Sequence, residues 1–265
     1  MSSSTREEVA PLLPSTNADS EPSGLRGESS ESTPGPAGNL DMVPTTRDKL
    51  ALGSIGAGLV LVLGTTWYLV FSGDLKAMGW FAVHPPMQSL AITAILLGIT
   101  PLQPPSTNSS IKQNRFKSHQ SIMLGLALPI LTIGSLAMVY NKYIHGSSHF
   151  TTWHGKLGLI SIIWIITQAF IGASSVWFNG KLFGGKENAK KVYKYHRLSG
   201  YLLITLMLFT IYLAGIHSDW ANGRKHLNLR ILAYYVGLPL IWIGLEAKQD
   251  EIHLNEIVRS HLQSP

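Results

Sequence analysis

Residues 119–140 of the chain read HQSIMLGLALPILTIGSLAMVY, and residues 154–177 read HGKLGLISIIWIITQAFIGASSVW. Each segment begins with a histidine and then continues with almost no charge. An α-helix needs about 20 apolar residues to cross the hydrocarbon core of a bilayer, where a spanning segment must satisfy its own backbone hydrogen bonds. The two stretches therefore predict membrane-spanning helices, each with a histidine near its start.

The same pattern continues on both sides of these two segments. Apolar stretches of spanning length occur at 50–71, 78–100, 119–140, 154–177, 197–217 and 229–246. Hydrophobic residues make up 45% of the chain and charged residues 14%, whereas soluble domains carry about 25% charge. This composition excludes a soluble enzyme. We expect an all-α membrane protein in which six transmembrane helices form an antiparallel bundle.

The two ends of the chain differ from this apolar domain. Residues 1–46 are rich in Ser, Thr, Pro and Glu and contain no aromatic residue, a composition typical of a disordered segment. We expect a disordered cytosolic tail at 1–46, a six-helix domain at 47–248 and a cytosolic C-terminal tail at 249–265. The chain contains no cysteine, which excludes disulfides, iron–sulfur clusters and thioether-linked haem.

Lysine and arginine counts predict the orientation. Six spans place both termini, and the loops expected at 101–117 and 179–194, on one side of the membrane. The other side holds only six of the 21 basic residues, namely Lys76, Lys142, Lys156, Arg224, Lys225 and Arg230. Basic loops stay in the cytosol, so both termini are predicted to be cytosolic. Glu8 with Leu12 and Leu13 has the spacing of a dileucine sorting signal, and an endomembrane is favoured over the plasma membrane.

Four histidines, one near the start of each of the second to fifth predicted helices, are the candidate functional residues. They are His84, His119, His154 and His196. Each alone could cap a helix or lie among lipid headgroups, but ionisable residues in membrane helices usually face the bundle interior or a cofactor. Neighbouring helices run antiparallel, so His84 shares one depth with His154, and His119 shares the other with His196. The pattern predicts two haems with two histidine ligands each, one in each half of the bilayer.

Two glycines support this arrangement. Gly158 follows His154 by four residues and Gly200 follows His196 by four, so each lies one turn further along the same helix face. A flat macrocycle bound by the histidine needs that turn to be free of side chains. Small residues also mediate helix packing in membranes, so either glycine alone is equally consistent with packing. The repetition beside both histidines favours cofactor binding.

Three stretches around the histidines resemble the cytochrome b561 family: HPPMQSLA at 84–91, SHFTTWHG at 148–155 and YHRLSG at 195–200. The chain is more similar to the domain-containing (D-type) members than to the chromaffin-granule type. The resemblance covers about residues 80–217 and implies six helices, two b haems and electron transfer across the membrane from cytosolic ascorbate. It also implies that the axial ligands of the haem irons are His84, His119, His154 and His196.

The activity implied by the resemblance is that of a transmembrane oxidoreductase that reduces monodehydroascorbate or ferric chelates on the far side. Iron with two histidine ligands has no open position, so substrates are expected to react at the haem edge, and no catalytic side chain is predicted. The basic residues expected to bind anionic ascorbate are Arg115, Lys117, Lys190, Lys191 and Lys194. These residues would equally fix the topology or neutralise haem propionates. His149 resembles a family histidine near the non-cytosolic haem and is expected to carry a proton there.

Two other classes of function stay open at this point. His145, His149 and His154 have a spacing compatible with a metal site, which would make the protein a non-haem metal-dependent membrane enzyme. A cofactor-free membrane scaffold or transporter is the second class. The net charge of +6 does not indicate a nucleic-acid partner, because the basic residues lie between long apolar runs. Membrane lipid is the expected surrounding, and a homodimer is a possible assembly.

Overall fold

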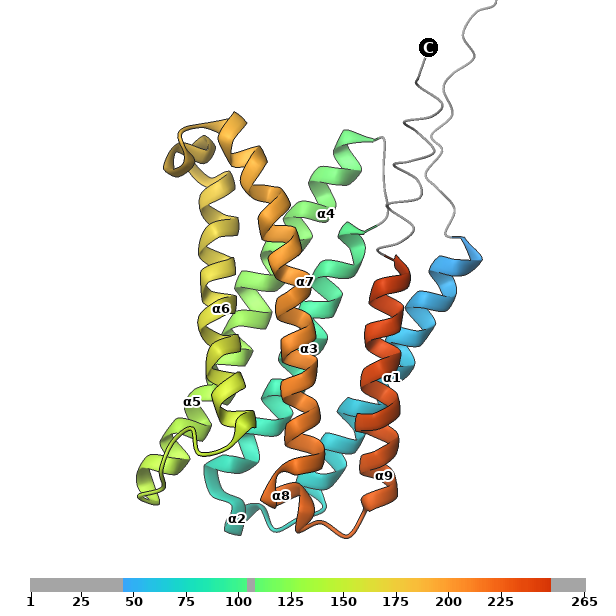
Figure 1. Cartoon of the computed structure of the whole chain (residues 1–265), viewed down its shortest axis with the longest axis vertical. Helices are drawn as coiled ribbons and strands as arrows, with labels where there is room; N and C mark the ends of the chain where they lie inside the picture. Colours follow the sequence, from blue (N-terminus) through green and yellow to red (C-terminus); the bar gives the residue numbers. More distant parts are fainter. Residues whose placement is uncertain (1–44, 104–107, 249–265) are drawn as a thin grey trace, which may run out of the picture. The chain divides into compact units, whose positions relative to one another are not determined.

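The computed structural model describes residues 45–103 and 108–248, which form a series of helices joined by short connections (Figure 1). Six helical segments are long and apolar enough to cross a membrane: Thr46–Phe71, Leu75–Leu102, Ser109–Ile144, Trp153–Phe183, Lys186–His217 and Leu227–Lys248. They confirm the six spans predicted from the sequence and describe an integral, multi-pass membrane protein. The predicted tails and the dileucine-like motif lie outside the described residues, apart from Thr45 and Thr46.

Each span is built from one or more helical elements. In chain order these are α1 (Thr46–Phe71), α2 (Leu75–Met78), η1 (Gly79–Val83), α3 (His84–Ile99), η2 (Thr100–Leu102), α4 (Ser109–Ile122), η3 (Met123–Ala127), α5 (Leu128–Ile144), α6 (Trp153–Val176), η4 (Trp177–Phe183), α7 (Lys186–His217), α8 (Asp219–Asn222), α9 (Leu227–Ile231) and η5 (Leu232–Gly237). The elements η3 and η5 are π-helical turns inside the third and sixth spans. We call the end of the bundle where α1 begins the terminal end, which is uppermost in Figure 1.

The third and fifth spans are longer than the sequence predicts. Residues 109–117 belong to α4 and residues 186–194 to α7, although both were expected to be loops. Hydropathy detects only the part of a helix that lies in lipid, whereas α4 is started by the Asn108 side chain, which accepts hydrogen bonds from two main-chain N–H groups. His119 and His196 therefore lie about 10 residues, or about 15 Å, inside their helices. The expectation that they lie near helix starts is wrong for these two.

The first and last spans pack tightly against each other through small residues. A Cβ atom on Gly58 of α1 would collide with the main-chain oxygen of Gly237, and one on Gly244 would come within 2.6 Å of the main-chain oxygen of Ala51. Such close approach of backbones is how membrane helices gain packing without a hydrophobic driving force. This helix pair lies beside the four spans that carry the candidate histidines (Figure 1).

At the other end of the bundle, Arg230 connects the start of the sixth span to the end of the fifth. Its side chain is 3% exposed and donates hydrogen bonds to the main-chain oxygens of Gly215 and Ile216, at 2.9 and 3.0 Å, and to Asn222 Oδ1 at 2.9 Å. The guanidinium thereby satisfies two carbonyls in the last turn of α7 that have no partner within the helix. A charge this deeply buried is tolerated because its donors are paired.

The Arg230→Met substitution is expected to destabilise the protein by about 2–4 kcal/mol, because three acceptors, of which the Gly215 oxygen is buried, lose their donor. Thermal unfolding in detergent, followed by tryptophan fluorescence, should show a melting temperature lower by roughly 5–10 °C. Lys225→Met is the matched control, since Lys225 is an exposed basic residue at the same end. Equal melting temperatures for the two variants would contradict this role of Arg230.

Candidate functional site

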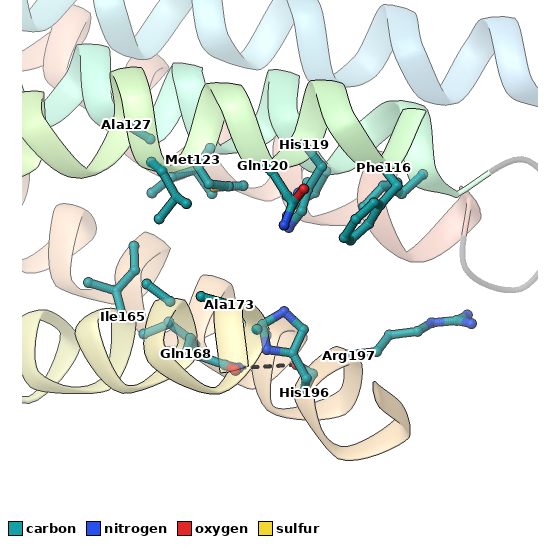
Figure 2. Close-up of a pocket in the computed structure, with 18 of the residues that line it drawn as sticks. Phe116, His119, Gln120, Met123, Ala127, Ile165, Gln168, Ala173, His196 and Arg197 are labelled. Carbon is teal, nitrogen blue, oxygen red and sulfur yellow. Dashed lines mark hydrogen bonds between the residues drawn. The ribbon is translucent and has the colours of Figure 1, made fainter. Parts of the chain in front are cut away.

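The four predicted histidines lie in two pairs at different levels of the bundle. His84 is the first residue of α3 and His154 the second residue of α6, and their ring centroids are 6.1 Å apart with the ring planes at 74°. The other pair lies nearer the terminal end: His119 on α4 and His196 on α7 line opposite walls of one cavity (Figure 2). The structure thus brings together the same pairs that the sequence predicts.

The cavity between His119 and His196 has a volume of about 550 Å³. Its inner part is lined by apolar side chains of α3, η3, α6 and α7, and two buried amides, those of Gln103 and Gln168, also line the cavity. Near its outer part lie residues that precede or follow the histidines on α4 and α7. Those that bear a positive charge are Lys112, Arg115 and Arg197. The site therefore combines a dry interior with a cationic rim.

Three of the four histidines are oriented by the backbone of a neighbouring helix. The Nδ1 atoms of His84, His119 and His154 lie 2.9, 3.1 and 3.0 Å from the main-chain oxygens of Gly134, Gly98 and Thr210, respectively. A carbonyl oxygen only accepts hydrogen bonds, so Nδ1 must be the protonated nitrogen in each ring. The lone pair is then on Nε2, the arrangement found for most histidines that bind metals.

This geometry fits haem iron. Ring nitrogens bind first-row metals at roughly 2.0–2.1 Å, so two imidazoles on opposite faces of one iron have ring centres about 6 Å apart. The 6.1 Å between His84 and His154 matches that value. At the other level, the cavity separates His119 from His196 and offers the space that a bound group needs.

The predicted glycines are consistent with the same fit. A Cβ atom on Gly200 would have Gln168 Nε2 as its nearest neighbour at 3.7 Å, and one on Gly158 would have Thr210 Cγ2 at 3.9 Å. These are ordinary contact distances, unlike the collisions at the packing glycines of α1, and Gly200 lines the cavity. Sequence reasoning missed Gly172 of α6, where a Cβ atom would come within 3.0 Å of His196 Cε1. That glycine makes room for the ring of His196.

The basic residues divide into two groups. Of the five predicted to bind substrate, Arg115 lines the cavity, whereas the exposed residues Lys117, Lys190, Lys191 and Lys194 do not. Lys190 instead forms an ion pair of 2.9 Å with Glu187.

The phase of the helix explains this division. Residues three, four and seven positions before His119 share its face of α4, and they are Phe116, Arg115 and Lys112. Lys117, two positions before it, points elsewhere. Had α4 been predicted to extend to Ser109, its 3.6-residue period would have indicated Lys112. Arg197 and Tyr193, which flank His196 on α7, also line the cavity and were not predicted.

The loop histidines do not form a metal site in this structure. His145 and His149 are exposed, and the Nδ1 atom of His145 lies 2.7 Å from the main-chain oxygen of Asn141. Within the described ranges 45–103 and 108–248, no group of three or more His, Cys, Asp or Glu residues is arranged to hold a metal ion. The geometry therefore gives no support to the non-haem metal enzyme considered above.

Comparison with known proteins gives a result that agrees with the paired histidines. Residues 103–222 match the sequence profile described as eukaryotic cytochrome b561. Over these residues the chain is similar to the cytochrome b561 family. A D-type relative, the transmembrane reductase CYB561D2 of Bos taurus, is 30% identical to this chain over 100 residues. That alignment covers 37% of this chain and 45% of the relative.

The matched region of the chain contains three of the four histidines. His119, His154 and His196 lie within residues 103–222, whereas His84 lies before them. The structure places His84 opposite His154 and so completes the second pair.

Proposed function

We propose that this protein carries electrons from cytosolic ascorbate, through two b haems, to monodehydroascorbate or a ferric chelate on the other side of the membrane. The observation that supports this most directly is the arrangement of four histidines from four consecutive spans in two pairs, with three rings oriented by backbone carbonyls. The name of the bovine relative, a transmembrane reductase, agrees with such an activity.

His84 and His154 would hold one haem iron, and His119 and His196 the other, each through Nε2. Haem b with two imidazole ligands gains and loses one electron while keeping both ligands. The hydrogen bonds from Nδ1 to Gly134, Gly98 and Thr210 hold three of the rings in place. Apolar side chains such as Ile165 and Met207 keep water away from the inner part of the cavity.

The cavity near the terminal end would be the site where ascorbate delivers electrons. Because most lysine and arginine residues lie at this end, we assign it to the cytosol. Lys112, Arg115 and Arg197 place positive charge on the rim, which favours an anion there. The exposed Lys117, Lys190, Lys191 and Lys194 add to the field that attracts the anion from a distance.

On the opposite side, the acceptor would approach the level of His84 and His154. His149 lies exposed in the connection before α6, five residues ahead of His154. An exposed imidazole at this place would exchange one proton with ascorbate or its radical. An endomembrane location and a homodimer belong to the same proposal.

The proposal is tested by a reduced-minus-oxidised visible spectrum of the full chain in lipid nanodiscs, with haem quantified per polypeptide. The expected result is a b-type signal that corresponds to two haems per chain. Ascorbate added from one side should reduce at least one of them. A chain that is purified folded but takes up no haem would overturn the proposal and favour the scaffold or transporter alternative.

The cationic rim provides a separate prediction. Replacing Arg115 and Arg197 with Gln is expected to raise the KM for ascorbate by about tenfold, because a hydrogen bond to a charged group contributes about 1.5–3 kcal/mol. The control pair, Lys117→Gln with Lys190→Gln, removes the same charge from exposed positions outside the cavity. Its KM should change by less than about threefold at physiological salt, which screens exposed charges. Equal effects of both pairs on ascorbate kinetics, at unchanged haem content, would contradict a binding role for the rim.

A further inference from the structure

His196 differs from the other three histidines. Its Nδ1 atom is buried and has no hydrogen-bond partner among residues 45–103 and 108–248. The ring packs against the α6 turn at Gly172, whose main-chain oxygen forms no hydrogen bond with Nδ1. That oxygen already accepts a hydrogen bond from the Ser175 hydroxyl at 2.7 Å. The backbone therefore does not orient this fourth ring.

The side chain next to His196 has an unpaired hydrogen-bond acceptor. Gln168 of α6 is 6% exposed, lines the cavity, and donates a hydrogen bond of 3.1 Å from Nε2 to the main-chain oxygen of His196 (Figure 2). Its Oε1 atom is buried and has no partner within the described residues. A buried donor and a buried acceptor thus lie unpaired in two residues that are already hydrogen-bonded to each other. Leaving either one unpaired is unfavourable by about 1–3 kcal/mol.

We propose that Gln168 is the positioning residue of His196: its Oε1 accepts the hydrogen bond from Nδ1–H while its Nε2 stays on the main-chain oxygen. Rotation of the imidazole would pair the two groups and leave Nε2 free to bind the iron. This inference rests on the proposed function, because it assigns His196 as a haem ligand. It means that one of four ligands is oriented by a replaceable side chain, whereas the other three are oriented by backbone groups that no substitution removes.

The expected consequence is a selective effect on one haem. A stronger acceptor on Nδ1–H makes an imidazole a better electron donor, which favours the oxidised iron, and loss of the acceptor favours the reduced iron. Gln168→Met keeps the length of the side chain and removes the acceptor. Gln168→Glu keeps the shape and supplies a stronger acceptor when it is ionised. The two substitutions should therefore shift the same haem in opposite directions.

The test is a redox titration of the full chain in nanodiscs, followed by visible spectroscopy so that the two haems are resolved. At a fixed ambient potential, Gln168→Met should raise the reduced-to-oxidised ratio of one haem by about threefold to tenfold, where tenfold corresponds to 59 mV for one electron. Gln168→Glu should lower the ratio of that haem. The other haem should keep its potential in both variants.

Gln88→Met is the matched control. Gln88 of α3 also donates its amide to a neighbouring helix, to the Leu131 main-chain oxygen at 3.1 Å and to Ser135 Oγ at 2.9 Å. It follows His84, whose Nδ1 already has a backbone partner. The control should leave both potentials unchanged. The inference is overturned if neither Gln168 variant shifts the potential of a haem. It is also overturned if the Gln168 variants shift both haems and Gln88→Met has the same effect.

Ser175→Ala supplies a second test that makes only a small change to the packing. It removes the hydroxyl that donates to the Gly172 main-chain oxygen, on the α6 turn against which the His196 ring packs. In the Ser175→Ala background, the shift caused by Gln168→Met should shrink, and additive shifts would argue against a shared role. A wild-type chain without any haem would overturn both this inference and the proposed function. A chain with two haems that do not respond to Gln168 would overturn this inference alone.

Discussion

Replacing His119 or His196 with alanine is expected to halve the haem content and to leave a haem that cytosolic ascorbate no longer reduces. Both residues line the cavity whose rim carries Lys112, Arg115 and Arg197, so the missing haem would be the one next to ascorbate. Substitution of an outer-shell partner of a metal ligand already weakens binding or activity by about 10–100-fold, and loss of the ligand itself should do more. Haem quantification and the rate of reduction by ascorbate measure the two effects.

The control for this experiment is His217→Ala, which removes an exposed histidine from the far end of α7. It should keep both haems and normal reduction. The haem that remains in the His119 and His196 variants serves as an internal check that the bundle has folded. Retention of both haems, or full reduction by ascorbate, would refute the assignment of this pair.

The His84→Ala and His154→Ala variants are expected to show the opposite behaviour. The cytosolic haem should remain and should still be reduced by ascorbate, because the cavity and its rim are unchanged. Electron transfer to an acceptor enclosed inside proteoliposomes should be lost, because one haem alone would have to span a hydrocarbon core about 30 Å thick. Reduction of enclosed ferric chelate by external ascorbate gives the measurement.

Comparison of the four variants tests which histidines bind the same haem. The 6.1 Å between the rings of His84 and His154 predicts that these two substitutions give the same phenotype, distinct from that of the other two. An identical spectral loss in all four folded variants would argue against two separate haem sites. If the His84→Ala and His154→Ala variants transferred electrons into the vesicles at the wild-type rate, these two histidines would not be needed for electron transfer.

Hydropathy was sufficient for the spans and insufficient for their ends. All six spans were found because lipid demands long apolar segments, and the structure has a spanning helix at each. The polar first turns of α4 and α7 were taken for loops, since they carry no apolar signal. Without those turns, hydropathy gives no reason to place Lys112 on the helix face of His119, where it lines the cavity. The helical period shows which residues share a face only when the helix is known to include those residues.

By itself, the sequence determined the number of spans and indicated which histidines pair, because antiparallel helices of fixed length bring residues at equal depth together. Only the tertiary structure decided what holds those rings. The acceptors at Gly134, Gly98 and Thr210 lie 50, 21 and 56 residues from their histidines. Every residue has a carbonyl, so no residue type marks the one that will face a given ring. The absence of such an acceptor at His196, and the position of Gln168 beside it, likewise follow from how α6 and α7 pack.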